Sequence, residues 1–330
     1  MQNFQGKLAV VTGAGTGMGR ELSRQLASEG CHLAICDVIL ENMDETKKLC
    51  EAVAPAGTRI TAHPCDVSDE RQVVAFRDAV TRRHETGYIN LLFNNAGVGG
   101  GGSFIHDDRT EWDKTFGVSW FGVYYCTRAF MPLLLAGTEG HIVNLSSVNG
   151  FWACMGPIPH TAYSSAKFAI KGFSEALLTD LRINAPHVKV SVVMPGHIGT
   201  SIAVNSRKLH GHPDPADLGT EDLVITRERM GRVGFPTDDM SDAELKVMIQ
   251  QQIDDFHDTA PLSAAQAATI ILDGVRREDW RILVGEDAHA LDRLVREFPE
   301  EAYEPVFLEK IQAEGQLNQF DLPGDPDPQT

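Results

Sequence analysis

The sequence predicts a doubly wound α/β fold, in which helices cover both faces of one parallel β-sheet. Two observations carry this prediction. Short runs rich in Val, Ile and Leu alternate with longer segments of helical period, as expected when each strand is buried on both faces. A glycine-rich turn directly follows the first run and opens a helix. The seven expected strands are Lys7–Thr12, His32–Asp37, Arg59–Pro64, Leu91–Asn94, Gly140–Ser146, Lys189–Met194 and Arg281–Val284.

Helices are expected between these strands. The segment Arg20–Glu29 places Leu22 and Leu26 on one face and stops before Gly30, a residue suited to a helix C-terminus. A longer helix is expected from about Ala162 to Leu181. Each of these helices connects two strands, as parallel pairing requires.

Roughly eighty residues separate the sixth and seventh strands, more than one crossover helix needs. Within them, Ser241-x-x-Glu244 and Ser263-x-x-Gln266 have the spacing of capping boxes, so at least two helices are expected. The seventh strand must still return to the same sheet. We therefore expect one domain over residues 1–330, with a lid insert at 200–262 and an acidic C-terminal extension at 286–330.

The charge of the chain is strongly acidic and unevenly placed. The sequence has 29 Lys and Arg against 46 Asp and Glu, a net charge of −17, which disfavours binding to nucleic acid or to an anionic membrane. Residues 238–330 hold 22 of the acidic residues against 7 basic ones, so the remainder is nearly neutral. We expect this acidic part to form a lid rim, a subunit contact or a solubilising surface. An acidic rim would disfavour anionic substrates by repulsion.

Cysteine spacing and hydropathy indicate the cellular compartment in which the protein is expected. The six cysteines form no C-x-x-C pair and have no clustered histidines, which indicates free thiols rather than a zinc site or a disulfide framework. The first strand begins too early for a signal peptide, and no apolar run approaches the ~20 residues of a membrane span. The expectation is a cytoplasmic protein without a resident metal.

The glycine-rich turn reads Thr12-Gly13-Ala14-Gly15-Thr16-Gly17-Met18-Gly19. Glycines let bare backbone N–H groups approach a pyrophosphate, whose charge is favoured at the start of the following helix. Asp37 ends the second strand, where a carboxylate can accept hydrogen bonds from both ribose hydroxyls and repel a 2′-phosphate. This favours NAD over NADP. A purely structural helix-capping role for Asp37 would leave the cofactor open.

The sharpest chemical signal is Tyr163-Ser164-Ser165-Ala166-Lys167. An i, i+4 spacing puts the phenol and the ammonium on one helix face, where the cation favours the phenolate and lowers the pKa of Tyr163. Tyr163 can then accept a proton during alcohol oxidation or donate one during ketone reduction. The preceding strand ends in Ser146 and Ser147.

Taken in order, these motifs resemble the short-chain dehydrogenase/reductase family over most of residues 7 to 200. Asp66-Val67, Asn94-Asn95-Ala96-Gly97 and Pro195-Gly196-His197-Ile198-Gly199-Thr200 also match its pattern. The resemblance implies a Rossmann-like sheet with strand order 3-2-1-4-5-6-7. It implies cofactor contacts from Gly13, Thr16, Gly17, Met18, Gly19, Asp37, Asp66, Val67, Asn95, Tyr163, Lys167, Ile198 and Thr200.

The resemblance also implies the catalytic roles. Ser147 would hold the substrate oxygen, Tyr163 would transfer the proton, and Lys167 would lower the phenol pKa and bind the nicotinamide ribose. The family's V-N-x-x-G motif is replaced by Val118-Ser119-Trp120-Phe121-Gly122, so Ser119 stands where an asparagine usually completes the proton relay. A hydroxyl can still position a water molecule.

Substrate contacts are expected from the loop between Ser147 and Tyr163 and from the turn after the sixth strand. Phe151, Trp152, Met155 and His197 are the candidates, with packing beneath the insert as the alternative for the loop. Residues 207–232 mix basic and acidic side chains and are expected to form a solvent-facing lid rather than an anion site.

The resulting hypothesis is an NAD-dependent oxidoreductase that interconverts a hydrophobic secondary alcohol, cyclic or aromatic, and its ketone. The partner is then a small molecule, and the resemblance implies a homotetramer or homodimer built through the helices flanking the fourth and fifth strands and through the final strand region. Two alternatives stay open: a 3-oxoacyl thioester reductase using the same residues, and a non-catalytic NAD-binding sensor.

Overall fold

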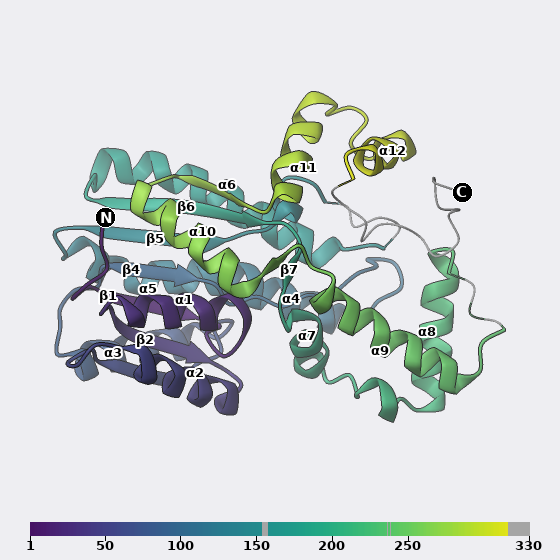
Figure 1. Ribbon diagram of the computed structural model, residues 1–330, viewed down its shortest axis with the longest axis horizontal. Coiled ribbons are helices and arrows are strands. Elements are labelled where there is room, and N and C mark those ends of the chain that lie inside the picture. Colours follow the sequence, from purple (N-terminus) through teal and green to yellow (C-terminus); the bar gives the residue numbers. More distant parts are fainter. Residues whose placement is uncertain (154–157, 236, 238, 316–330) are drawn as a thin grey trace.

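A parallel sheet of seven strands organises the computed structural model, which describes residues 1–315 except 154–157, 236 and 238 (Figure 1). The strand order is β3-β2-β1-β4-β5-β6-β9, which confirms the predicted order. Each expected strand is found with both ends within one residue of the prediction. The strands are β1 Leu8–Thr12, β2 His32–Asp37, β3 Ile60–Pro64, β4 Leu91–Asn94, β5 Gly140–Leu145, β6 Val188–Pro195 and β9 Arg281–Val284.

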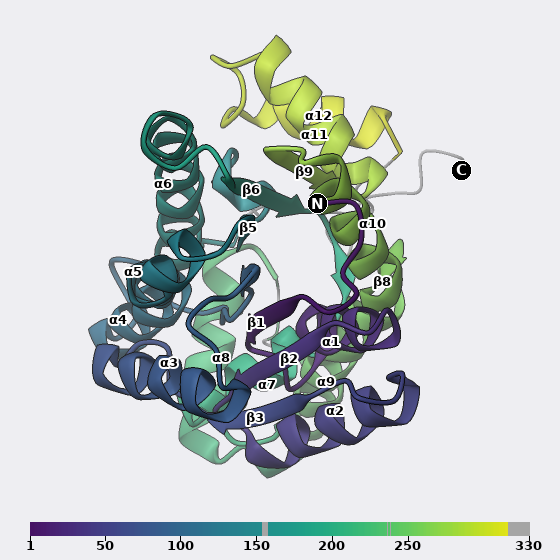
Figure 2. The same cartoon turned by 90° about the vertical axis from the view of Figure 1, so that its left-hand side faces the viewer.

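Helices cover both faces of this sheet (Figure 2). On one face α1 (Gly17–Ser28), α2 (Leu40–Val53) and α10 (Ala264–Arg277) pack over alternate strand residues such as Val11 and Leu33. On the other, α3 (Glu70–His84), α5 (Gly122–Leu135) and α6 (Thr161–Asn184) pack over Val10 and Leu92. Because neighbouring residues of a strand point to opposite faces, each strand supplies both cores.

Two short strands were not predicted from the sequence. Strand β7 (Ile198–Gly199) pairs in parallel with β8 (Leu262–Ser263), outside the main sheet. Two residues are too few to give a hydrophobic period, so the sequence holds no signal for this pair. The pairing joins the two ends of the insert.

The insert contains three α-helices among the residues that the structure describes: α7 (Ile202–His210), α8 (Thr220–Arg232) and α9 (Asp242–Asp258). Both predicted capping boxes are confirmed, at the starts of α9 and α10. Helix α9 buries Leu245 and Ile249 against Leu218 and Leu223, which forms a small core separate from the sheet. These helices lie beyond the carboxyl edge of the sheet, beside α4 (Arg109–Phe116) (Figure 1).

The C-terminal helices α11 (Glu286–Glu297) and α12 (Pro305–Ala313) form another separate cluster. Trp152, from the loop after β5, is buried between them, and its Nε1 donates to the carbonyl of Ala302. The described part of the loop that contains Phe151 and Trp152 therefore packs against the C-terminal extension, not beneath the insert as the alternative expected. No helix in the described part of the chain is both long and apolar enough to cross a membrane.

Candidate active site

Two cavities lie side by side where the strands end. One, of about 250 Å³, is lined by the glycine-rich turn, and the other, of about 390 Å³, is lined by Ser147 and Tyr163. Ile202, the first residue of α7, lines both. We call them the glycine-loop cavity and the serine–tyrosine cavity. In an open α/β sheet the carboxyl edge is where ligands bind.

The glycine-rich turn leaves the start of α1 open to the glycine-loop cavity. Gly13 and Gly17 have φ angles of +61° and +54°, which favour glycine, and a Cβ on Gly13 would come within 2.7 Å of Ala96. Thr16 caps the helix without a side-chain hydrogen bond, and the first turn carries no acidic residue. Its free N–H groups can therefore bind a phosphate.

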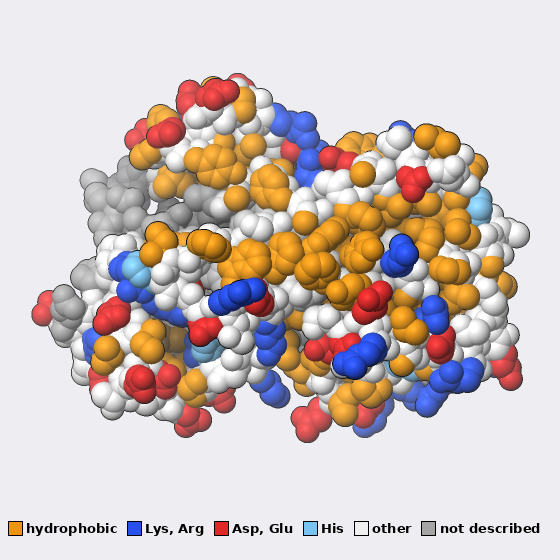
Figure 3. Space-filling model, turned by 180° about the vertical axis from the view of Figure 1, so that it is seen from behind, with side chains coloured by type: hydrophobic (Ala, Val, Ile, Leu, Met, Phe, Trp, Pro, Cys, Tyr) orange, Lys and Arg blue, Asp and Glu red, His pale blue; other side chains and the backbone are white. Residues whose placement is uncertain are grey.

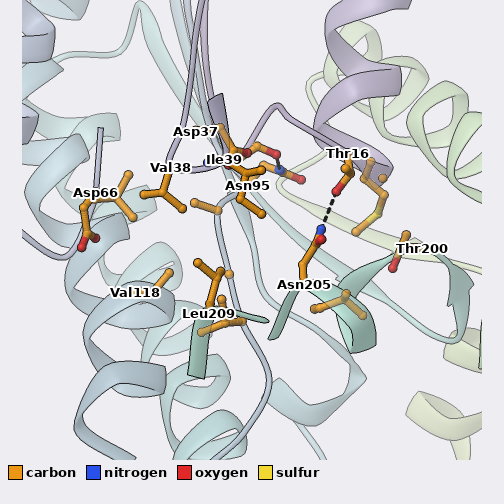
Figure 4. A pocket seen from close by; sticks show the side chains of 18 of the residues that line it. Thr16, Asp37, Val38, Ile39, Asp66, Asn95, Val118, Thr200, Asn205 and Leu209 are labelled. Atoms are coloured by element: carbon orange, nitrogen blue, oxygen red, sulfur yellow. Dashed lines mark hydrogen bonds between the residues drawn. The ribbon is translucent and has the colours of Figure 1, made fainter. Parts of the chain in front are cut away.

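Asp37 lies at the edge of the glycine-loop cavity (Figure 4). One carboxylate oxygen accepts a hydrogen bond from the Gly15 amide at 2.8 Å, and the other accepts one from the Ile39 amide at 2.9 Å. The carboxylate thus has a structural role, yet each oxygen keeps a lone pair for a ribose hydroxyl. Among the described lining residues the one cation is Lys114, whose ammonium donates to the carbonyl of Leu209.

Most of the predicted cofactor residues line this cavity. They are Gly13, Thr16, Gly17, Met18, Asp37, Asp66, Val67, Asn95 and Thr200. Gly19 and Ile198 are buried in packing instead: a Cβ on Gly19 would come within 2.2 Å of the Gly13 carbonyl, and Ile198 belongs to the sheet core. Asn95 holds the turn in place, because its amide donates to the carbonyls of Thr12 and Gly13, each at 2.9 Å.

One contact across the glycine-loop cavity was not predicted. The side-chain amide of Asn205, on α7, donates to the Thr16 hydroxyl at 2.8 Å (Figure 4). The same helix is anchored further along, where the Gly99 amide donates to the Ser206 hydroxyl at 2.8 Å. These two hydrogen bonds hold α7 against the lining of both cavities. The sequence could have indicated this contact, because α7 begins directly after the turn that contains Thr200, a predicted cofactor residue.

Ser147 and Tyr163 meet at the wall of the serine–tyrosine cavity, with Lys167 buried one turn further along α6. The Lys167 Nζ atom lies 5.2 Å from the centre of the Tyr163 ring and donates to the carbonyl of Leu145 at 2.9 Å. Ser146 points elsewhere, because its hydroxyl donates to the carbonyl of Lys167 at 2.8 Å. The strand end and the helix together fix the three side chains.

Burial dominates the electrostatics of this group. It raises the pKa of Tyr163 to about 12, although the hydrogen bond with Ser147 opposes the rise. Burial likewise lowers the pKa of Lys167 to about 8. The cost of burying a phenolate thus exceeds the effect of the hydrogen bond with Ser147, and the expected lowering of the pKa of Tyr163 by Lys167 stays a prediction.

Ser119 is fully buried in a single π-helical turn, Gly117–Phe121 (η1). Its hydroxyl donates to the carbonyl of Val98 at 3.2 Å and accepts from the Val98 amide at 3.3 Å. Gly97 separates Ser119 and Lys167 from the glycine-loop cavity, and a Cβ there would lie 3.4 Å from the Lys167 Nζ atom and 3.7 Å from the Ser119 hydroxyl. Both polar groups therefore lie just behind the cavity wall.

The predicted substrate residues have different surroundings. Trp152 and His197 line the serine–tyrosine cavity, whereas Phe151 packs against the C-terminal cluster and Met155 lies outside the described residues. The His197 ring bonds the carbonyl of Phe256 at 2.6 Å, so its Nε2 atom is already satisfied.

Four charged residues also line the serine–tyrosine cavity: Glu111, Arg207, Arg229 and Asp287. Arg207 and Arg229 belong to the segment expected to form a solvent-facing lid, and in the structure both also lie at the cavity wall. Their helices fold back over the sheet edge, which a local charge pattern cannot reveal. Among the described residues, no group of His, Cys, Asp and Glu could hold a metal ion.

Comparisons with known proteins agree with this geometry. The profile of a family described as short chain dehydrogenase matches residues 7–210. The Mycobacterium tuberculosis protein named oxidoreductase SadH is 33% identical over 90% of this chain and 92% of its own. A Burkholderia phymatum short chain dehydrogenase/reductase solved with NAD covers 99% of both chains at 27% identity and a TM-score of 0.67.

A second solved relative carries the other cofactor. A metagenomic short-chain oxidoreductase in complex with NADP is 33% identical, covers 58% of this chain and 83% of its own, and has a TM-score of 0.51. Solved structures similar to this chain thus contain NAD in one case and NADP in another.

Proposed function

Since this chain belongs to the short-chain dehydrogenase/reductase family of enzymes acting on CH–OH groups, we propose that it interconverts a hydrophobic secondary alcohol, cyclic or aromatic, and its ketone with NAD. The observation that carries the proposal is the hydrogen-bonded pair of Ser147 and Tyr163 at a cavity wall, with Lys167 behind it. Apolar side chains of Trp152 and Leu291 line the same cavity and suit an apolar substrate body.

NAD fits the residues around the glycine-loop cavity. The free N–H groups at the start of α1 suit its pyrophosphate, and Asp37 suits an unphosphorylated ribose. Val38 and Ile39 beside that carboxylate are apolar, so neither offers a cation to a 2′-phosphate. When bound, NAD supplies the acceptor or donor of the hydride.

The protein's own groups handle the proton and the substrate oxygen. The Ser147 hydroxyl holds that oxygen, and the Tyr163 hydroxyl takes the proton during oxidation or returns it during reduction. With its raised pKa, Tyr163 stays protonated at neutral pH and is ready to donate. The Lys167 ammonium lies close behind Gly97, near enough to the glycine-loop cavity to contact the nicotinamide ribose. Ser119 supports the wall between Lys167 and the glycine-loop cavity, because its hydroxyl donates to the carbonyl of Val98.

We further propose a homodimer or homotetramer built on the face formed by α4, α5 and α6. A hydrophobic band crosses this face (Figure 3). Exposed large apolar side chains of the helices on this face lie on α5, on α6 and on η1, the turn just before α5, and are Phe121, Leu135, Phe168 and Ile183. An apolar surface of this kind is typical of a subunit contact. The described cysteines are all buried and free, which favours a reducing compartment such as the cytoplasm.

The test is NADH formation by the purified protein with a panel of cyclic and aromatic secondary alcohols, and NADH consumption with the matching ketones. Tyr163→Phe should lower kcat by about 10²–10⁴-fold, because general acid–base catalysis contributes that much. Tyr88→Phe, at an exposed tyrosine outside both cavities, is the matched control.

Three results would contradict the proposal. NAD binding without turnover of any alcohol or ketone would favour the sensor. Faster turnover of 3-oxoacyl thioesters than of any free ketone would favour the thioester reductase. Equal activity of Tyr163→Phe and the native protein would remove Tyr163 from the reaction.

A further inference from the structure

Helix α7 presents a guanidinium group to the serine–tyrosine cavity. Arg207, in the last turn of α7, lines this cavity, and its Nη2 atom donates to the carbonyl of Pro213 at 2.8 Å. This is a neutral acceptor. Among the residues that the structure describes, no carboxylate lies within ion-pair distance of Arg207. Burial lowers the pKa of Arg207, while Asp214 and Asp222 act in the opposite direction.

The other charged groups of the cavity wall already have partners. Arg229 pairs with Asp107 at 3.1 Å. Glu111 accepts a hydrogen bond from the Gly101 amide at 2.9 Å and lies 3.4 Å from the ring nitrogen of His212, and this setting lowers the pKa of Glu111 to about 2. Arg207 thus differs from Arg229 in lacking a carboxylate partner in the described chain.

The acidic C-terminal part contributes little negative charge to this cavity. Of its described acidic residues only Asp287 lines the wall. The Asp287 carboxylate accepts a hydrogen bond from the His197 amide at 2.6 Å, and burial raises the pKa of Asp287 toward its neutral form. Among the described residues, the acidic C-terminal part therefore adds only Asp287 to the lining of the cavity.

The surroundings of Arg207 favour pairing with a bound anion. The other α7 residues along the cavity are the apolar Ile202 and Ala203 and the polar Ser206 and His210. Both polar side chains already have partners at Gly99, and Asn205 bonds Thr16. A guanidinium partly removed from water gains more from an ion pair than one in solvent does. Its planar fork of donors matches the two oxygens of a carboxylate.

We propose that Arg207 binds a carboxylate of the substrate, so that the enzyme acts on hydroxy acids or keto acids with an apolar body. The inference rests on the proposed function, because the same cavity must also place the alcohol against Ser147 and Tyr163. The carboxylate is bound by the lid and the alcohol by the sheet edge. The apolar body spans the space between them.

The experiment uses acids of increasing length with their neutral methyl esters: 4-hydroxycyclohexanecarboxylate, (4-hydroxycyclohexyl)acetate and 3-(4-hydroxycyclohexyl)propanoate. For at least one length, kcat/KM should be about tenfold or more higher for the acid than for its ester, as a charge-assisted hydrogen-bonded pair provides. Arg207→Gln keeps a donor for Pro213 and should lower this acid-to-ester ratio by about the same factor. Lys208→Gln removes a cation from the neighbouring exposed position and should keep the ratio.

An ester preferred at every length would overturn the inference. So would an Arg207→Gln variant that lowers acid and ester turnover equally, because Arg207 would then serve only the fold. Calorimetric binding of the acids to Tyr163→Phe with NAD provides a readout without turnover. If no alcohol reacts yet the acids bind and Arg207→Gln removes that binding, the proposed reaction fails while the carboxylate site stands.

Discussion

Residues 1–200 and residues 201–315 contribute to the same site in different ways. The first part supplies the sheet edge, the glycine-rich turn and the group of Ser147, Tyr163 and Lys167. The second part supplies Ile202, Arg207 and Leu291 from helices that lie across the cavities. Changes to Ser147, Tyr163 or Lys167 should therefore affect every substrate alike, whereas changes to Arg207 or Leu291 should alter which substrate is chosen.

Apart from the loss of activity expected for Tyr163→Phe, the largest effect is expected for Asp37→Asn, on the choice of cofactor. Asp37→Asn keeps one oxygen to accept from a backbone amide, but it removes the charge that repels a 2′-phosphate. Losing one charge-assisted hydrogen bond and that repulsion should shift the ratio of kcat/KM for NAD over NADP by about 100-fold toward NADP. Steady-state kinetics with both cofactors measures the shift. An unchanged ratio would mean that Asp37 only stabilises the turn through Gly15 and Ile39.

The pH dependence of ketone reduction is expected to be the next largest effect. Tyr163, with a pKa of about 12, keeps its proton over the working range, whereas Lys167, with a pKa of about 8, loses its charge as the pH rises. The rate of ketone reduction should be constant below pH 8 and fall by about tenfold per pH unit above it, because the Lys167 ammonium loses a single proton. Rates across that range provide the measurement.

Lys167→Arg is the companion variant for this profile, since a guanidinium stays charged throughout. For Lys167→Arg, the fall in the reduction rate should move to a pH above the range that can be measured, even if the rate of this variant is lower throughout. A native profile that stays flat well above pH 8 would show that Lys167 keeps its proton or is not needed.

The smallest expected effect concerns the contact between the lid and the sheet. Asn205→Ala removes one neutral hydrogen bond to Thr16, so the Kd for NAD should rise about fivefold. Calorimetry on Asn205→Ala, Thr16→Ala and the double variant forms a cycle that isolates the pair. Additive effects would indicate that α7 does not hold the glycine-rich turn through this bond.

The sequence predicted the seven main strands, their order and both capping boxes, because each has a local cause such as a buried apolar run or a hydroxyl three residues before a carboxamide or carboxylate. It also indicated the residues at the strand ends, since those ends meet at one edge. It did not predict that Arg207 faces inward or that Trp152 packs on the C-terminal helices. Both depend on how distant helices fold back, which no local period encodes.

The hydrogen bond from Trp152 to the carbonyl of Ala302 joins residues 150 positions apart in the chain. Ribosomes make the proton-transferring residues long before they make α11, which supplies Asp287 and Leu291 to the serine–tyrosine cavity, and α12, which packs beside it. During synthesis, the apolar surface around Trp152 stays uncovered until Phe307 has emerged to pack on it. Among the described residues that line this cavity, Leu291 is therefore the last that the growing chain acquires.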